Sequence, residues 1–137
     1  MNSRKTNRIG IAIVEHQRQF LIGVRPSGVA LAGFHEFPGG KCRAEETAEA
    51  CAVRECKEET GLDVIAVNEL LYEEHAYDHA DVKLHFWLCR PKQSLTELKD
   101  CDLKGFHWFP VESLPELQFP EANARLIKLL VSSYSDS

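Results

Sequence analysis

Apolar residues recur along this chain at two spacings, one typical of β-strands and the other of α-helices. Residues 9–14 are apolar and rich in β-branched side chains, and residues 20–25 form a second apolar run after a polar break. This pattern predicts a hairpin of two buried strands. Residues 63–75 alternate loosely between apolar and polar and residues 82–89 alternate clearly, so a sheet is expected to continue through them.

Helical spacing occurs in two other stretches. Residues 47–60 lack Gly and Pro and carry an apolar stripe, and Gly61 follows where a C-cap glycine is expected. These residues predict one helix of about four turns. A second helix is predicted from Pro120, because proline suits the first helical position and an apolar stripe follows it.

The remaining segments predict loops and short strands. A loop over residues 26–34 leads to a short strand at residues 35–37, and Pro38-Gly39-Gly40 predicts a break. Residues 90–104 are polar and irregular, and residues 105–109 predict a last strand. The order strand-rich, helix, strand-rich, helix favours an α+β or sandwich-like arrangement of layers over a doubly wound α/β fold. A Rossmann fold is also disfavoured, because no GxGxxG motif follows a strand.

Length and composition narrow the class of protein. The chain has 137 residues, 44% hydrophobic and 27% charged, so residues 1–137 are expected to form a single domain. No apolar run approaches the roughly 20 residues that cross a bilayer, and the start lacks the apolar region of a signal peptide, so we expect a cytoplasmic protein without a membrane partner.

Cysteine content and charge exclude further classes. Five cysteines without a CxxC pair predict reduced thiols rather than a disulfide framework or a zinc site. The net charge is -5 and no basic cluster occurs beyond the first residues, so duplex nucleic acid is not an expected partner. The oligomeric state is left open between monomer and homodimer.

The first predicted helix carries an unusual group of acidic residues. Glu55, Glu58 and Glu59 are spaced i, i+3 and i+4, which places three carboxylates on one face where they repel one another. A bound cation would remove the repulsion. Oxygen ligands favour a hard ion such as Mg²⁺, with Mn²⁺ as a substitute, and Mg²⁺ commonly shares its ligands with substrate phosphates. A nucleotide polyphosphate is therefore a candidate substrate, and a solvated helix face is the ordinary alternative.

The spacing of these residues resembles a known signature. The pattern consists of Gly40, then five residues, Glu46, then seven residues, and the run from Arg54 to Leu62, and it resembles the complete Nudix box, here residues 40–62. The resemblance implies an α+β fold of Nudix type, with an α/β/α sandwich around a mixed β-sheet and a loop-helix-loop formed by the box. It also implies hydrolysis of nucleoside diphosphates linked to another moiety.

The same resemblance implies roles for the residues of the box. Glu55, Glu58 and Glu59 would bind Mg²⁺ together with the carbonyl of Gly40, and Glu55 would also activate the attacking water. Glu46 and Arg54 would orient the helix and its carboxylates. Arg54 could in addition pair with Glu58 one turn later.

Outside the box the chain is similar to the MutT-like branch of this family. HEFPGGK at residues 35–41, KLHFWLC at residues 83–89 and QFPEAN at residues 118–123 carry the similarity. It implies hydrolysis of 8-oxo-dGTP or related oxidised purine nucleotides to the monophosphate and pyrophosphate.

The MutT-like similarity also implies residues that bind the substrate. Asn123 would hydrogen-bond the purine edge, Phe37 would line the base pocket, and Arg25 and Lys41 would approach the phosphates. An asparagine amide both donates and accepts, which suits the O6 and N7–H edge of 8-oxoguanine. The ordinary alternatives are a helix cap for Asn123, a core position for Phe37 and surface charges for Arg25 and Lys41.

The chain departs from that branch in two places. A further carboxylate that the branch supplies before its last strand has no clear counterpart, and the candidates are Glu97, Asp100 and Asp102. The tip at residues 77–81 lacks the arginine that related proteins place near the base. Alternative functions are therefore hydrolysis of CTP, a modified dCTP, an ADP-sugar or a dinucleoside polyphosphate, or a non-catalytic module that binds nucleotides.

Overall fold

The computed structural model describes residues 5–78, 80–99 and 101–134, and a seven-stranded mixed sheet forms its centre. The main path of the sheet is β3-β2-β1-β6-β5, with β4 paired to β1 and β7 paired to β2. β1 and β6 are parallel, and the other described pairs are antiparallel. In chain order the strands are β1 (Lys5–His16), β2 (Gln19–Val24), β3 (His35–Glu36), β4 (Gly39–Lys41), β5 (Val64–Tyr77), β6 (Ala80–Pro91) and β7 (His107–Pro110).

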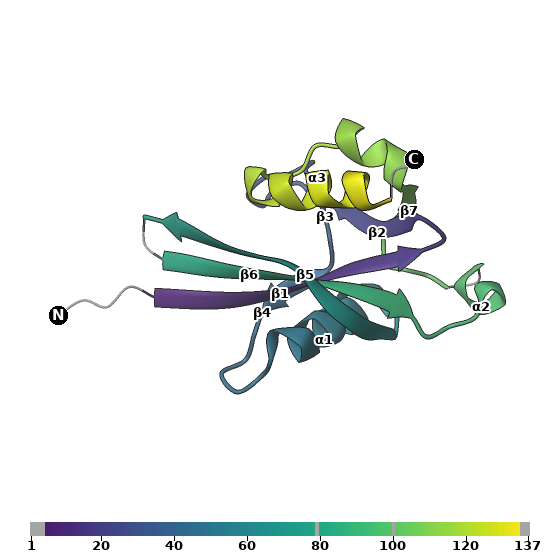
Figure 1. Ribbon diagram of the computed structural model, residues 1–137, viewed down its shortest axis with the longest axis horizontal. Helices are drawn as coiled ribbons and strands as arrows, with labels where there is room; N and C mark the ends of the chain where they lie inside the picture. Colours follow the sequence, from purple (N-terminus) through teal and green to yellow (C-terminus); the bar gives the residue numbers. More distant parts are fainter. Residues whose placement is uncertain (1–4, 79, 100, 135–137) are drawn as a thin grey trace.

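Helices cover both faces of this sheet (Figure 1). The helix α1 (Ala48–Thr60) lies on one face, and α3 (Ala124–Ser133) lies on the other together with the 3₁₀ helix η1 (Val111–Glu116). This is the layered α+β arrangement that the sequence predicts. Two further short helices are α2 (Leu95–Lys99) and the 3₁₀ helix η2 (Glu121–Asn123).

The predicted first hairpin is confirmed, and its alternating side chains build the core on both faces. β1 and β2 pair through Glu15 opposite Phe20, with Gln17 and Arg18 in the turn. Ala12 and Val14 belong to the cluster under α1, whereas Ile13 belongs to the cluster under α3. Successive strand residues point to opposite faces, so one apolar run serves two cores.

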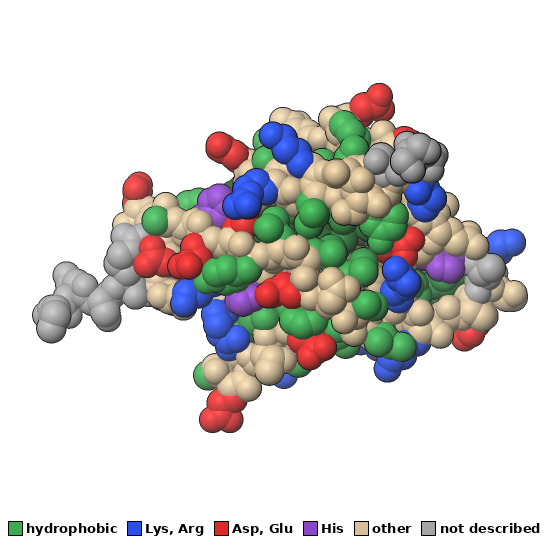
Figure 2. Space-filling view, in the orientation of Figure 1, with side chains coloured by type: hydrophobic (Ala, Val, Ile, Leu, Met, Phe, Trp, Pro, Cys, Tyr) green, Lys and Arg blue, Asp and Glu red, His purple; other side chains and the backbone are tan. Residues whose placement is uncertain are grey.

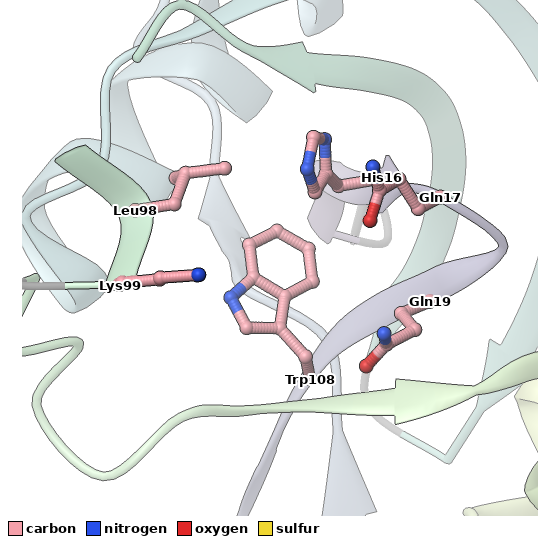
Figure 3. Close-up of a pocket in the computed structure, with 6 residues that line it drawn as sticks. All are labelled: His16, Gln17, Gln19, Leu98, Lys99 and Trp108. Atoms are coloured by element: carbon pink, nitrogen blue, oxygen red, sulfur yellow. The ribbon is translucent and has the colours of Figure 1, made fainter. Parts of the chain in front are cut away.

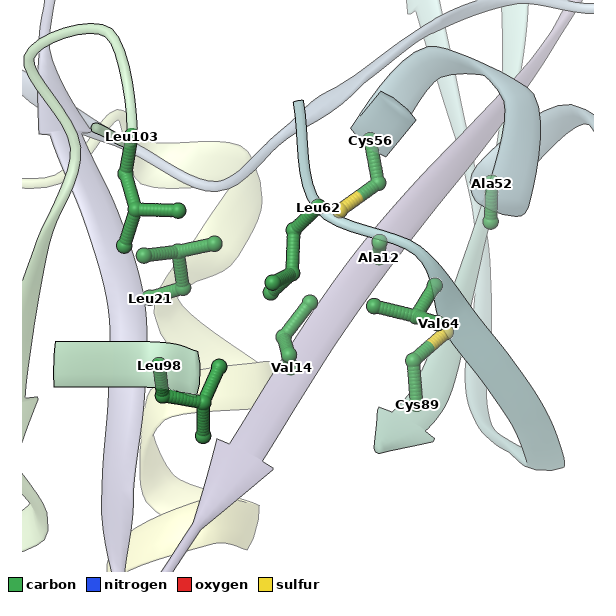
Figure 4. Close-up of a cluster of buried hydrophobic side chains, with 10 residues drawn as sticks. All are labelled: Ala12, Val14, Leu21, Ala52, Cys56, Leu62, Val64, Cys89, Leu98 and Leu103. Atoms are coloured by element: carbon green, nitrogen blue, oxygen red, sulfur yellow. The ribbon is translucent and has the colours of Figure 1, made fainter. Parts of the chain in front are cut away.

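The core on the α1 side is shown in Figure 4. Side chains from α1, β1 and β6 meet there with two leucines from the segment between β6 and β7. Its buried members are Ala12, Val14, Leu21, Ala52, Cys56, Leu62, Val64, Cys89, Leu98 and Leu103. The core therefore holds α1, the helix of the box, directly against the sheet.

The first predicted helix is confirmed, with caps at both ends. The hydroxyl of Thr47 accepts a hydrogen bond from the N–H of Ala50 at 3.0 Å, and Gly61 ends the helix in the left-handed region at φ 80°. Against β1 the helix lies so close that a Cβ on Gly10 would be 2.8 Å from Cys51 Cβ. Glycine at this position permits the close approach of helix and strand.

Three predictions of local structure are wrong in detail. Pro38-Gly39-Gly40 is not a simple break, because β4 pairs with β1 through Gly10 opposite Gly40. The segment 90–104 is not wholly irregular, because Ser94 and Glu97 form a capping box at α2. The last α-helix begins at Ala124 rather than at Pro120, because Pro120 has an extended ψ of 150° and η2 intervenes.

Cysteines and surface charges follow their predicted pattern. All five cysteines are free thiols, of which Cys51, Cys56 and Cys89 are buried. On the face drawn in Figure 2, basic side chains are scattered among acidic ones and form no continuous basic stripe. Within the described ranges, no helix has the length and apolar character that crossing a membrane requires.

Candidate active site

The residues of the box meet where β4 passes beside α1. A Cβ on Gly40 would lie 2.5 Å from the carboxyl carbon of Glu55, so the Glu55 carboxylate occupies the space that any larger residue at position 40 would fill. One residue earlier, the N–H of Gly39 donates to Oε2 of Glu59 at 3.1 Å. The glycine pair thus brings the strand backbone within contact distance of two predicted metal ligands.

Arg54 organises three carboxylates from the middle of this site. Its Nε donates to Glu46 Oε2 at 2.7 Å and its Nη2 donates to Glu46 Oε1 at 2.9 Å, a two-pronged ion pair. Its Nη1 donates to Glu55 Oε1 at 2.9 Å and to Glu58 Oε2 at 3.2 Å. Arg54 therefore ties the loop before α1 to two predicted ligands on the helix.

The ion pair with Arg54 shifts the protonation of both partners. Hydrogen bonding to Arg54 lowers the pKa of Glu46 to about 2, and the N–H of Arg43 adds a smaller effect in the same direction. The pKa of Arg54 is raised, chiefly by Glu46. The side chains are only 19% and 12% exposed, so this pair is shielded better than an ordinary surface salt bridge.

The pKa of Glu59 is shifted in the opposite direction to that of Glu46. Burial and a hydrogen bond to the neighbouring Glu55 carboxyl raise the pKa of Glu59 to about 8, while the N–H of Gly39 acts the other way. The carboxyl groups of Glu55 and Glu59 are thus held close together, and ionising both of them is unfavourable. A cation bound between them would remove this penalty.

The donor set fits a divalent cation in its chemistry. The Glu55 carboxylate lies against Gly40 and is linked to Glu58 through Arg54 and to Glu59 by a hydrogen bond. The carbonyl of Gly40 accepts a hydrogen bond from the thiol of Cys51 at 3.3 Å. Among the described residues no group of three acidic, His or Cys side chains already converges on one point. Arg54 explains this, because it draws Glu55 and Glu58 toward itself while Glu59 bonds to the backbone of β4.

A cavity of about 190 Å³ opens next to the box. It reaches the box at Gly39 and brings together Arg25, Phe37 and Asn123, which come from three distant parts of the chain. Lys41 does not line this cavity. The full lining is Ile9, Ile11, Arg25, Leu31, Glu36, Phe37, Gly39, Pro120 and Asn123.

The structure can be compared with the alternative roles of Asn123, Phe37 and Arg25, namely helix cap, core residue and surface charge. Asn123 stands at the N-cap position of α3, but its side chain makes no capping hydrogen bond, so the capping interpretation is wrong. Phe37 is both a core residue and a wall of the cavity, since it is 7% exposed and stacks on Phe119 with ring centres 5.1 Å apart. Arg25 is held by Glu36 at 3.2 Å and by the carbonyl of Ala30 at 2.8 Å.

Sequence reasoning missed Glu36 and the apolar residues Ile9, Ile11 and Leu31 in the lining of this cavity. Glu36 lies inside the HEFPGGK stretch beside Phe37, and strand alternation alone would have directed it away from that side chain. Lys104 was also missed, although its Nζ donates to the carbonyl of Glu58 at 3.3 Å. No spacing in the sequence links Lys104 to α1, because β5, β6 and α2 lie between them along the chain.

A second hollow, of about 180 Å³, lies at the other end of β1 beside α2 (Figure 3). Its lining contains no carboxylate and no residue of the box, so it is a poor candidate for metal-dependent chemistry. In Figure 3 the indole of Trp108 lies between the turn of the first hairpin and the side chain of Lys99. The lining consists of His16, Gln17, Gln19, Leu98, Lys99 and Trp108.

Of the candidates for a further carboxylate, the two that the structure describes, Glu97 and Asp102, do not line the cavity beside the box. Glu97 accepts from the N–H of Ser94 at 3.1 Å, which lowers its pKa and gives it a capping role at α2. Asp102 accepts from the N–H of Lys104 at 3.1 Å and lines a separate hollow near Trp108. Asp100 lies outside the described residues, as does His79 in the tip at residues 77–81.

Several known proteins are similar to this chain in sequence. Residues 10–129 match the family model described as NUDIX domain. A Haemophilus influenzae protein named 8-oxo-dGTP diphosphatase is 30% identical over 130 residues, covering 94% of each chain. A Proteus vulgaris protein of the same name is 34% identical over 72% of this chain and 89% of its own. An Escherichia coli protein named CTP pyrophosphohydrolase is 30% identical over 56% of each chain.

Solved structures share the fold. A MutT protein from methicillin-resistant Staphylococcus aureus, described as a Nudix hydrolase, superimposes with a TM-score of 0.74 at 26% identity, covering 96% of this chain and 99% of its own. The Escherichia coli ORF135 protein gives a TM-score of 0.76 at 20% identity, covering 96% of this chain and 93% of its own. These likenesses confirm the predicted α+β architecture, with helices on both faces of a mixed sheet.

Proposed function

The chain belongs to the Nudix family and is a Nudix hydrolase, and from this premise we propose that it is a Mg²⁺-dependent nucleoside triphosphate pyrophosphohydrolase. We propose 8-oxo-dGTP, or a related oxidised purine nucleotide, as its favoured substrate. The products would be the nucleoside monophosphate and pyrophosphate. The observation that carries this proposal is the cavity beside the box, because it joins Asn123 and Phe37 to Gly39.

We assign the reaction to the box. Gly40, Glu55, Glu58 and Glu59 would hold the ion, which when bound neutralises phosphate charge and lowers the pKa of water. Glu55 lies against Gly40 and is the group we assign to take the proton from the attacking water. Arg54 acts as a positioning residue, because it binds Glu55 and Glu58 from the anchor of Glu46.

We assign the choice of base to the cavity. The amide of Asn123 is not used as a helix cap, so its N–H and C=O groups can pair with the O6 and N7–H edge of 8-oxoguanine. In unmodified guanine N7 is an acceptor, which would face the amide oxygen without a hydrogen atom between them. Phe37 supplies an apolar wall, and we assign Arg25 and, from outside the cavity, Lys41 to the phosphates.

Relatives support this substrate and also a second one. Two relatives named 8-oxo-dGTP diphosphatase are 30% and 34% identical to most of this chain. The relative named CTP pyrophosphohydrolase keeps CTP or a modified dCTP as the second candidate. The tip at residues 77–81 has no arginine, which weakens the parallel with the MutT-like branch. We place the enzyme in the cytoplasm as a single domain acting on the nucleotide pool.

A nucleotide panel tests the proposal. Product formation is measured by anion-exchange chromatography, because the last two substrates release no pyrophosphate, for 8-oxo-dGTP, dGTP, CTP, 5-methyl-dCTP, an ADP-sugar and a dinucleoside polyphosphate, each with Mg²⁺ and with EDTA. We expect the highest kcat/KM for 8-oxo-dGTP and no turnover in EDTA. A higher value for CTP would move the assignment to the second candidate. Absence of turnover for every nucleotide with Mg²⁺ would favour a binding module.

A further inference from the structure

Arg8 reaches from the sheet into the loop of the box. It lies in β1, half-buried, and its Nη2 donates to the carbonyl of Glu46 at 2.8 Å and to the carbonyl of Arg43 at 3.0 Å. Its own carbonyl accepts from the N–H of Cys42 at 2.8 Å. Arg8 therefore binds the loop through backbone and side chain together, 35 and 38 residues away in sequence.

The loop that Arg8 binds, residues 42–46, is held by two hydrogen bonds between Arg43 and Glu46. The N–H of Glu46 donates to the carbonyl of Arg43 at 3.1 Å, and the N–H of Arg43 donates to Oε1 of Glu46 at 3.0 Å. Both carbonyls that Arg8 binds belong to these two residues. The single Nη2 group of Arg8 thus fixes the backbone from which the Glu46 carboxylate extends.

Glu46 transmits this position to the carboxylates on α1. Its two oxygens take the two-pronged ion pair from Arg54, and Nη1 of Arg54 in turn binds Glu55 and Glu58. α1 itself is anchored independently, by the Thr47 cap and by its buried face. Loss of the Arg8 contacts should therefore loosen the position of Glu46 without unfolding the helix.

We infer that Arg8 is a positioning residue for the metal site, acting through the loop at residues 42–46 and through the Glu46–Arg54 ion pair. The inference rests on the metal site assigned under the proposed function, but it does not depend on which nucleotide is hydrolysed. Removing groups that support metal ligands typically weakens metal binding by about 10- to 100-fold. Arg8 is two contacts further out than Arg54, because Glu46 lies between them, so the expected loss is smaller, about 5- to 10-fold.

The test measures Mn²⁺ binding by electron paramagnetic resonance, without nucleotide, together with hydrogen exchange at the Glu46 amide. Arg8→Met should raise the Kd for Mn²⁺ about 5- to 10-fold and speed exchange at Glu46, with the α1 amides unchanged. Arg8→Lys keeps the positive charge and should recover part of the affinity for Mn²⁺. Recovery should be incomplete, because an ammonium is more strongly hydrated than a guanidinium and fits two planar acceptors less well.

Arg90 provides the matched control. It lies on β6 and pairs with Glu15 of β1 at 3.0 Å, so Arg90→Met removes a similar arginine contact away from the box. We expect its Mn²⁺ affinity and Glu46 exchange to match wild type. Unchanged Mn²⁺ affinity in Arg8→Met, or an equal loss in Arg90→Met, overturns the inference.

Two further results separate this inference from the proposed function. Failure of wild type to hydrolyse 8-oxo-dGTP would leave the role of Arg8 standing if Arg8→Met still weakens Mn²⁺ binding. Failure of wild type to bind Mn²⁺ would overturn both. If circular dichroism shows that Arg8→Met does not fold, Arg8→Gln and Arg8→Lys carry the same comparison, and wild-type affinity in both variants overturns the inference.

Discussion

Gly40→Ala should abolish most activity while leaving the fold nearly as stable as before. The added Cβ would lie 2.5 Å from the carboxyl carbon of Glu55, whereas carbon atoms pack at about 3.5 Å. The Glu55 carboxylate must therefore move by about 1 Å. A misplacement of that size in a catalytic group costs roughly 100-fold in rate, which corresponds to about 2.7 kcal/mol in the activation barrier.

The stability of Gly40→Ala should change little for two reasons. The atoms that must move are the far end of a flexible side chain, and no positive φ is imposed at position 40. Alanine also restricts the unfolded chain, which offsets part of any strain by about 0.4–1 kcal/mol. The expected shift in Tm is below about 5 °C.

Gly10→Ala is the matched control, because its Cβ would meet backbone instead. It would lie 2.7 Å from the carbonyl oxygen of Ala48 and 2.9 Å from the nitrogen of Ala52, so α1 itself must shift. Overpacking of this kind costs about 1–3 kcal/mol, and we expect Tm to fall by at least about 5 °C.

Thermal melts and steady-state rates on the best nucleotide of the panel provide the assay. Gly40→Ala should lose rate at nearly constant Tm, and Gly10→Ala should lose Tm. Retention of wild-type kcat within about threefold in Gly40→Ala would refute the placement of Glu55 against Gly40.

Three other substitutions test single groups of the site. Glu58→Gln should lower kcat several hundredfold or more at saturating Mg²⁺ and nucleotide, because one neutralising ligand is lost, and an unchanged kcat would exclude Glu58 from the reaction. The pKa of Glu59 is raised to about 8 in the folded protein, so its ionisation destabilises the fold as pH rises from about 4.5 to 8. In EDTA the Tm of Glu59→Gln relative to wild type should therefore increase across that range, and parallel curves would contradict the shift. The pKa of Glu46 is lowered to about 2, so its ionised form stabilises the fold above about pH 4.5 and loses this effect as pH falls toward 2. The Tm deficit of Glu46→Gln should shrink over that acid range, and a constant deficit would argue against the Arg54 pair as its cause.

The grouping of the three glutamates was predictable because they lie within one short stretch of the sequence. Spacing on a single helix fixes which side chains share a face, so Glu55, Glu58 and Glu59 could be grouped from sequence alone. Gly61 was predicted as the C-cap from local chemistry, whereas Thr47, which the prediction placed inside the helix, is its N-cap. The orientation of the Arg54 side chain could not be predicted from helix spacing, because its strongest partner, Glu46, lies in the loop before the helix.

The cavity could be predicted only through family resemblance. Arg25, Phe37 and Asn123 come together because β2, β3 and the segment before α3 pack against one another, and no periodicity encodes that packing. The three-residue strand β4 was missed for a related reason, since Gly39 and Gly40 have no side chains to show a strand pattern. Arg8 gave no signal at all, because its partners are backbone carbonyls.

The most direct test of the proposed function is the ratio of kcat/KM for 8-oxo-dGTP to that for dGTP with Mg²⁺. A site whose amide pairs with N7–H should reject the nucleotide that lacks this hydrogen, so we expect a ratio of at least about 100. Comparable values for the two nucleotides would contradict the assignment of Asn123 to the base and, with it, the proposed role in removing oxidised purine nucleotides.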